Sequence, residues 1–237
     1  MIGKGEMIGV FLQVRLHSNR LPAKALLEMA GVPLIGHAMK ALQGIDADAH
    51  ALVTERDSAD ALRPLAAQYG FDLFVGDPED VLDRYASAAA HYGVDTVIRA
   101  TGDNPLVSGA MARRILDIHR EVAADVSGFD ELPLGTGVEV VSTSSLEAAA
   151  AEAQDPYERE HVTPFMFRRP LRFRIHRIPA PAAYRYSRGR VTVDTPEDFH
   201  FVREIVEDLY EGTPIEIDEV VAWLSGSREH RRVRRMA

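Results

Sequence analysis

Apolar positions follow two alternating patterns through the first half of the chain. Short apolar runs, which predict buried strands, lie at residues 8–14, 50–54, 71–75 and 95–100. Between these runs, apolar residues recur every three or four positions, which predicts a helix after each strand. Gly70 and Gly93 stand where two of these helices are expected to end. Strands that alternate with helices predict an α/β fold, in which helices cover both faces of a mainly parallel sheet.

The second half of the chain is less regular. We expect strands at residues 135–141, 172–178 and 190–194, and helices at 145–153, 155–167, 195–209 and around Val220. Asp77-Pro78, Asp155-Pro156 and Thr195-Pro196 each resemble a helix start, in which a polar cap precedes proline and acidic residues. Pro164 predicts a kink or stop in its helix. Because no repeat or linker is evident, we expect one domain over residues 1–226 and a basic tail over 227–237.

Composition and charge narrow the class of protein. The chain has no cysteine, which excludes a disulfide framework, thiolate catalysis and zinc–thiolate sites and fits a reducing compartment. A net charge of −9 argues against general nucleic-acid binding, although residues 227–237 hold five arginines against Glu229. That tail is read as a solvated end or as a contact for an anionic partner. Arg15 interrupts the first apolar run, and no run approaches membrane-spanning length. We expect a cytoplasmic protein that binds neither nucleic acid nor a membrane.

The loop after the first predicted strand carries most of the candidate chemistry. Arg15, Ser18, Arg20 and Lys24 place three cations and a hydroxyl within ten residues. Such a loop, next to a buried strand, is suited to binding a polyanion. The alternative is a strand that runs into a solvated basic turn.

Two acids, Asp103 and Asp194, lie where predicted strands end. In doubly wound sheets, ligands bind outside the carboxyl ends of the strands, so these carboxylates are expected at the same rim as the basic loop. Carboxylates together with phosphate oxygens and water are the usual ligands of magnesium, and a metal beside lysine or arginine is what nucleotidyl or phosphoryl transfer requires. The alternatives are an Asx turn at Asp103 and, at Asp194, a residue just outside a capped helix.

Six motifs occur in order between Ile8 and Leu209: QVRLHSNRLPAK, VGDPEDVLDRY, VIRATGDNPL, GVEVVS, DPYEREHVTP and VTVDTPEDF. Together they resemble the spore-coat polysaccharide biosynthesis branch of the acylneuraminate cytidylyltransferase superfamily, relatives of the 3-deoxy-manno-octulosonate cytidylyltransferases. The resemblance implies a GT-A-like Rossmannoid nucleotidyltransferase fold, a homodimer and a divalent cation, Mg²⁺ or another such as Mn²⁺. It also implies that CTP reacts with a small anionic sugar-like acceptor to give CMP-acceptor and pyrophosphate.

Site residues follow from the same resemblance, position by position. It implies that Arg15, Ser18, Arg20 and Lys24 bind the triphosphate, and that Asp103 and Asp194 bind the metal. Lys24, Arg15 and Asp103 are then the expected catalytic residues.

Four further residues have two interpretations each. Arg84 is expected near the base or ribose of the nucleotide, or in a surface ion pair with Asp83. Glu139 faces either the acceptor pocket or solvent. Arg159 and His161 contact the acceptor or a second subunit, or lie on a solvated helix surface.

The loop also departs from the family pattern. Loops of this kind commonly have glycine where this chain has His17 and Ala23, and a side chain there can crowd a phosphate. Two other functions therefore stay open at this point: a glycosyltransferase that uses a nucleotide sugar on the same fold, and a non-catalytic nucleotide-binding homologue.

Overall fold

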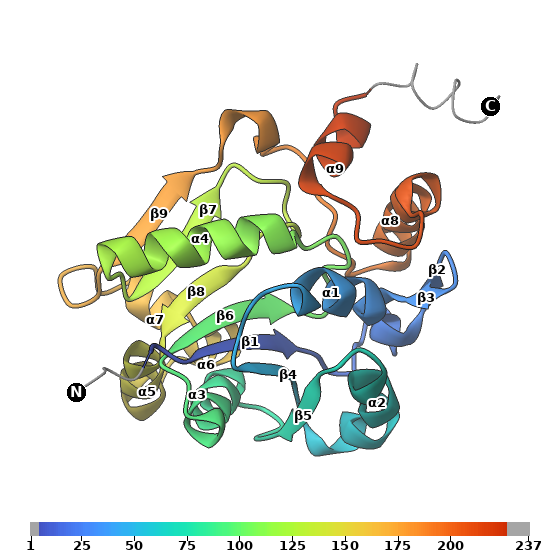
Figure 1. The fold of residues 1–237 in the computed structure, drawn as a ribbon. Helices are drawn as coiled ribbons and strands as arrows, with labels where there is room; N and C mark the ends of the chain where they lie inside the picture. The colour runs from blue at the N-terminus through green and yellow to red at the C-terminus, as the bar shows by residue number, and fades with distance from the viewer. Residues whose placement is uncertain (1–4, 227–237) are drawn as a thin grey trace.

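A seven-stranded sheet forms the centre of the structure, a computed structural model that describes residues 5–226 (Figure 1). In spatial order the strands are β5 (Asp72–Val75), β4 (Ala49–Thr54), β1 (Ile8–Gln13), β6 (Thr96–Thr101), β8 (Glu139–Ser142), β7 (Val126–Asp130) and β9 (Ile175–Pro179). β8 runs antiparallel to both of its neighbours, and every other pair in the sheet is parallel. The predicted α/β class and the mainly parallel sheet are therefore confirmed. The predicted basic tail, 227–237, lies outside the described residues.

Helices cover both faces of this sheet. They are α1 (Leu34–Gln43), α2 (Arg56–Gln68), α3 (Val81–Tyr92), α4 (Gly109–Val122), α5 (Thr143–Glu152), α6 (Pro156–His161), α7 (Pro164–Phe167), α8 (Pro196–Leu209) and α9 (Ile217–Leu224). Two 3₁₀ turns, η1 (Lys24–Leu26) and η2 (Ala182–Tyr184), and a short hairpin of β2 (Glu28–Met29) and β3 (Val32–Pro33) complete the description. None of the described helices is long and apolar enough to cross a bilayer.

The core consists of three clusters of buried side chains. Along β1, Val10 and Leu12 pack on one side with α1, α2 and α4, whereas Phe11 packs on the other side with α3, α5 and α7. This alternation is expected of a central strand, because successive side chains point to opposite faces. The third cluster joins α8 and α9 to Val191 and Val193, and Figure 1 shows these two helices side by side.

Several local predictions differ from the structure. Residues 190–194 do not form a strand of the sheet; Arg190 makes one isolated bridge to Leu134, and Val191 and Val193 are buried in the third cluster. Asp77-Pro78 does not begin α3 either. The Asp77 carboxylate accepts hydrogen bonds from the next turn, and Asp80 caps the helix. The strand β7 was not predicted, because its short VSGFD sequence has little apolar periodicity.

Other helix boundaries follow the sequence signals. Thr195 and Asp198 form the reciprocal capping box that opens α8. Gly93, in the left-handed conformation, ends α3. The helix predicted over 155–167 is divided into α6 and α7, which begins at Pro164.

Candidate active site

The site begins where the central strands β1 and β6 end side by side, with Gln13 paired to Thr101. The Gly102 backbone N–H donates to the Gln13 carbonyl at 2.7 Å, which holds the two following loops together. A Cβ atom at Gly102 would lie 2.9 Å from Val14 Cβ, so the close approach requires glycine. The basic loop after β1 and Asp103 after β6 therefore emerge at one edge, as the sequence predicted.

Lys24 brings the two predicted acids together. Its Nζ donates to Asp194 Oδ1 at 3.1 Å and to the Val193 carbonyl at 2.6 Å, and lies 3.8 Å from Asp103 Oδ2. The Lys24 side chain is only 14% exposed, so these charges interact largely away from solvent. Both carboxylates thus face one point, although they come from distant parts of the chain.

The backbone fixes both acids. The Val193 N–H donates to the Asp103 carbonyl at 2.8 Å, and the Asp194 N–H donates to Asp198 Oδ2 at the start of α8. On the other side, the Thr101 hydroxyl donates to Asp103 Oδ1 at 2.7 Å. Residues 190–194 do not form a strand of the sheet, so the cap of α8 positions Asp194 instead.

Cations surround Asp194. Arg190 Nη2 lies 2.6 Å and Arg20 Nη2 3.1 Å from its carboxylate, in addition to Lys24. Burial alone would raise the pKa of Asp194, but the hydrogen bond with Lys24 and the neighbouring arginines hold this pKa below its usual value. The Asp194 side chain is therefore a carboxylate at neutral pH. Arg190 belongs to the site although the sequence analysis did not single it out.

The other two residues of the predicted triphosphate loop lie apart from this cluster. Arg15 Nη2 pairs with Glu160 Oε1 on α6 at 2.9 Å, and both side chains are more than one-third exposed. Ser18 Oγ accepts a hydrogen bond from the Leu21 N–H within the loop. Their contact with a triphosphate stays a prediction.

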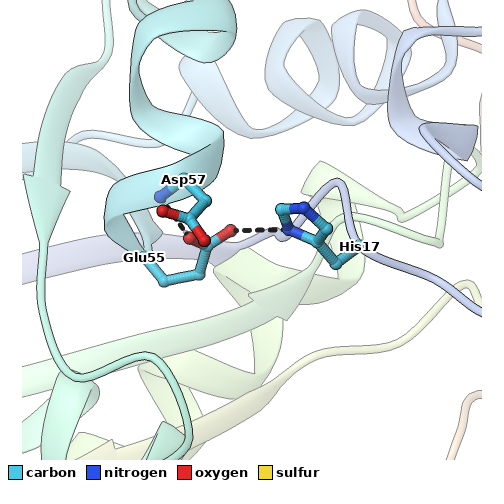
Figure 2. A group of neighbouring side chains, drawn as sticks. All are labelled: His17, Glu55 and Asp57. Atoms are coloured by element: carbon cyan, nitrogen blue, oxygen red, sulfur yellow. Dashed lines mark hydrogen bonds and ion pairs between the residues drawn. The ribbon is translucent and has the colours of Figure 1, made fainter.

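His17 points toward Glu55 at the start of α2 (Figure 2). Its Nδ1 lies 3.6 Å from Glu55 Oε1, and the Glu55 carboxylate caps α2 by accepting from the N–H groups of Asp57 and Ser58. Burial raises the pKa of Glu55, but the Ser58 hydroxyl and these backbone donors lower it below its usual value. His17, Glu55 and Asp57 offer three ligand atoms within 4.8 Å of one another, and the helix cap accounts for this arrangement.

Ala23 has a backbone conformation that usually favours glycine. Its φ is 53°, in the left-handed region, and its N–H closes the basic loop by donating to the Leu16 carbonyl at 2.9 Å. The loop therefore keeps its backbone path with alanine, at a conformational cost.

Arg84 is fully buried on α3, so the predicted surface ion pair with Asp83 is wrong. Its Nη1 donates to the carbonyls of Asp77 and Pro78, whereas Nε and Nη2 have no hydrogen-bond partner among residues 5–226. Burial, and then the charge of nearby Arg15, lower the pKa of Arg84. A buried guanidinium with spare donors is suited to an anionic or carbonyl ligand.

Glu139 lines a cavity of about 410 Å³, and its contact with an acceptor stays a prediction. Arg99 Nη1 donates to its carboxylate at 2.9 Å and Thr163 Oγ1 at 3.1 Å. Cavities of this size accommodate small-molecule ligands. The polar and charged residues of the lining include Arg99, Thr101, Asn104, Glu131, Glu139 and Arg177.

Arg159 and His161 do not line this cavity. Arg159, on α6, pairs with Asp80 at the start of α3 and donates to the carbonyls of Ala150 on α5 and of Ala153 just after it, so it links three helices. The His161 ring packs on Tyr157, with ring centroids 4.4 Å apart. Contact of either residue with an acceptor stays a prediction.

Two carboxylates and a lysine at the carboxyl edge of this α/β sheet are the residue types that nucleotidyl transfer requires. The chain belongs to the cytidylyltransferase family, whose sequence model, described as "Cytidylyltransferase", matches residues 10–221. This match confirms the family resemblance of the sequence motifs.

Individual relatives agree with this assignment. The chain is 27% identical over 221 residues to the spore coat polysaccharide biosynthesis protein SpsF of Bacillus subtilis. The aligned region covers 90% of this chain and 92% of that protein. It is 26% identical over 164 residues to the 3-deoxy-manno-octulosonate cytidylyltransferase of Yersinia pseudotuberculosis. That alignment covers 63% of this chain and 64% of the relative. A cytidylyltransferase structure from Leptospira borgpetersenii superposes with a TM-score of 0.85 at 23% identity, covering 93% of this chain and 94% of that one, and shares the fold.

Proposed function

We propose that this cytidylyltransferase transfers the CMP group of CTP to an oxygen of a small sugar acid or related acceptor and releases pyrophosphate. The observation that carries this proposal is the position of Lys24 Nζ, 3.1 Å from Asp194 and 3.8 Å from Asp103. A cation beside paired carboxylates at the rim of the sheet suits a reaction in which phosphate charge moves. The names of the relatives support the acceptor class.

The reaction itself is an in-line displacement. An acceptor oxygen forms a bond to the α-phosphorus of CTP, and the bond from that phosphorus to the bridging oxygen breaks. Pyrophosphate leaves with the electron pair, and the acceptor hydroxyl loses its proton to water. Lys24 and Arg20 stabilise the negative charge that develops on the leaving group, and Arg15 does so when it exchanges Glu160 for phosphate.

Asp103 and Asp194 would hold a divalent cation, Mg²⁺ or Mn²⁺. The residues fit such an ion, because two hard oxygen donors already converge on one cation, the Lys24 ammonium. When bound, the metal neutralises charge on the reacting phosphates. The two carboxylates are held for this role by the Thr101 hydroxyl and by the cap of α8.

The remaining parts of the proposal concern binding. Arg84 offers its two unpaired donors, Nε and Nη2, to the nucleotide. The cavity next to Asp103 receives the acceptor, with Glu139 in its wall. A homodimer and a cytoplasmic site of action belong to the same proposal; the resemblance of the sequence motifs supports the first and the cysteine-free sequence the second.

Pyrophosphate release tests the function directly. We expect release from CTP in preference to the other three ribonucleoside triphosphates, with Mg²⁺ and a panel of sugar acids. CTP with Mg²⁺ should also raise the melting temperature most. Asp103→Asn should remove most turnover and leave the fold intact, whereas Asp46→Asn, an exposed carboxylate on the loop after α1, should change neither.

Three results would contradict the proposal. Near-normal activity of Asp103→Asn would exclude that residue from the reaction. Sugar transfer from a nucleotide sugar without pyrophosphate release would indicate a glycosyltransferase. CTP binding without turnover across the panel would indicate a non-catalytic homologue.

A further inference from the structure

We propose that Arg190 is a positioning residue for the reaction: it holds Oδ2 of Asp194, so that Oδ1 faces Lys24 and the metal. The inference rests on the proposed function, because it concerns an acid that would hold the cation in that reaction. Arg190 acts through Asp194 and not by contact with the nucleotide or the acceptor.

The carboxylate of Asp194 divides its two oxygens between two sets of partners. Arg190 Nη2 donates to Oδ2 at 2.6 Å. Lys24 Nζ and Arg20 Nη2, both from the basic loop, each lie 3.1 Å from Oδ1. One oxygen is therefore held by Arg190, and the other faces the loop that is proposed to bind the triphosphate.

Asp103 shows the same division of its oxygens. The Thr101 hydroxyl donates to Oδ1 at 2.7 Å, whereas Oδ2 lies 3.8 Å from Lys24 Nζ. In both acids a side-chain donor of the protein takes one oxygen, and the other oxygen faces the Lys24 ammonium group. Because the two acids come from distant parts of the chain, the repeated arrangement indicates a common role. Arg190 does for Asp194 what Thr101 does for Asp103.

Tertiary contacts fix the backbone on both sides of Arg190. The Leu134 N–H donates to the Gly189 carbonyl at 2.8 Å, and the Val191 N–H donates to the Leu134 carbonyl at 2.7 Å. Val191 is also fully buried in the third core cluster. The side chain of Arg190 therefore starts from a fixed point.

The Arg190 guanidinium also reaches the acid that fixes the Asp194 backbone. Its Nε lies 3.7 Å from Asp198 Oδ1, and Asp198 Oδ2 accepts from the N–H groups of Asp194 and Thr195, both at 3.0 Å. An isolated ion pair at the surface contributes little. This pair differs, because the Asp194 side chain is only 21% exposed and its main chain is held by the second partner of Arg190.

A fixed carboxylate orientation is important for binding a metal. The last torsion of an aspartate side chain is broad and two-fold, so a carboxylate without such a partner can rotate and present either oxygen. Mg²⁺ demands near-ideal octahedral geometry. Residues that orient metal ligands accordingly change metal affinity or activity by about 10–100-fold when they are replaced.

The charge of Arg190 by itself predicts the opposite effect. Arg190 is a cation next to a metal-binding acid, so its repulsion should weaken the binding of a divalent cation. If charge were its only contribution, removal of Arg190 would strengthen metal binding. Loss of a positioning residue weakens metal binding instead. The sign of the change therefore separates the two roles.

Thermal-shift titrations measure metal binding without turnover. Mn²⁺ is added to the 237-residue chain at saturating CTP and without acceptor, and the concentration that gives half of the maximal rise in melting temperature is compared between variants. We expect this concentration to increase about 10–100-fold in Arg190→Met. Arg190→Lys keeps the charge but not the planar guanidinium, so its increase should be smaller. The Mg²⁺ concentration for half-maximal pyrophosphate release should rise in parallel.

Arg172→Met is the matched control. The Arg172 side chain is 45% exposed, against 44% for Arg190, and it pairs with Glu152 rather than with a residue of the site. This variant should bind Mn²⁺ as the wild type does. CTP added in EDTA tests the alternative that Arg190 contacts phosphate directly; Arg190→Met should leave that CTP-induced shift close to the wild-type value.

Three results would overturn the inference while pyrophosphate release by the wild type leaves the proposed function standing. The first is unchanged or tighter Mn²⁺ binding in Arg190→Met. The second is a loss of CTP binding in EDTA as large as the loss with Mn²⁺. The third, which applies if Arg190→Met does not fold, is wild-type Mn²⁺ binding in Arg190→Lys. Absence of pyrophosphate release from the wild type with every acceptor would instead overturn the proposed function.

Discussion

Lys24 Nζ lies 3.1 Å from Asp194 Oδ1, although 170 residues separate the two in the sequence. This contact closes the site, because it joins the loop after β1 to the segment that precedes α8. It also makes Lys24 the common neighbour of both carboxylates that would hold the metal.

Replacing Lys24 tests its role in charge stabilisation. Lys24→Met should reduce kcat about 100-fold or more, the usual loss when a donor to a developing oxyanion is removed. Arg63→Met, an exposed cation on α2, provides the control and should retain activity. Steady-state pyrophosphate release measures both variants, and circular dichroism checks the fold. Activity of Lys24→Met within a few-fold of wild type would exclude Lys24 from catalysis.

Glu160 is expected to compete with CTP for Arg15. Because a partly exposed ion pair is worth about 0.2–1 kcal/mol, Glu160→Gln should lower the KM for CTP by up to about fivefold. Glu152→Gln frees Arg172 at a distance from the site and should leave the KM for CTP unchanged. A higher KM in Glu160→Gln would show that Glu160 supports nucleotide binding instead.

Ala23 allows a test of backbone strain in the basic loop. Its left-handed conformation costs an L-residue about 1–2 kcal/mol. The greater flexibility of glycine costs about 0.5–1 kcal/mol. Ala23→Gly should therefore leave the free energy of unfolding unchanged or raise it by up to about 1.5 kcal/mol. Ala25→Gly, which removes a buried methyl group two residues later, should lower it by about 1–2 kcal/mol. Urea denaturation measures both, and a clear loss of stability in Ala23→Gly would contradict the strain argument.

Glu55 should make stability depend on pH. Its folded-state pKa lies below the ordinary value of 4.5, so the folded protein favours the charged carboxylate. The stabilisation that the charged Glu55 gives to the folded protein is fully present above about pH 4.5. It is lost as the pH falls through the lowered folded-state pKa. The difference in unfolding free energy between wild type and Glu55→Gln should therefore shrink as the pH falls from 7 to 3. Glu211→Gln, an exposed change after α8, controls for the lost charge. A difference that grows at low pH would contradict the assigned cap.

The sequence by itself determined much of the local structure and which charged residues are candidates for the site. Strand and helix periods, the Thr195 cap and the glycine at the end of α3 are local signals, because they depend on residues within one or two turns. The placement of Asp103 next to the basic loop also followed from the sequence, because both end parallel strands. The strand β7 was not predicted, because its five residues mix apolar, polar and glycine positions.

Only the tertiary structure decided how the charges are paired. Arg15 contacts Glu160 rather than the acids, Arg84 is buried rather than paired on the surface, and Asp194 is placed by a helix cap instead of a sheet strand. The antiparallel position of β8 directs Glu139 into the cavity. These relationships join residues far apart in the chain, and they depend on how sheet and helices pack, which no local pattern of apolar and polar residues specifies. The sequence thus named Lys24, Asp103 and Asp194 as candidates, and packing brought them to within a few ångströms of one another.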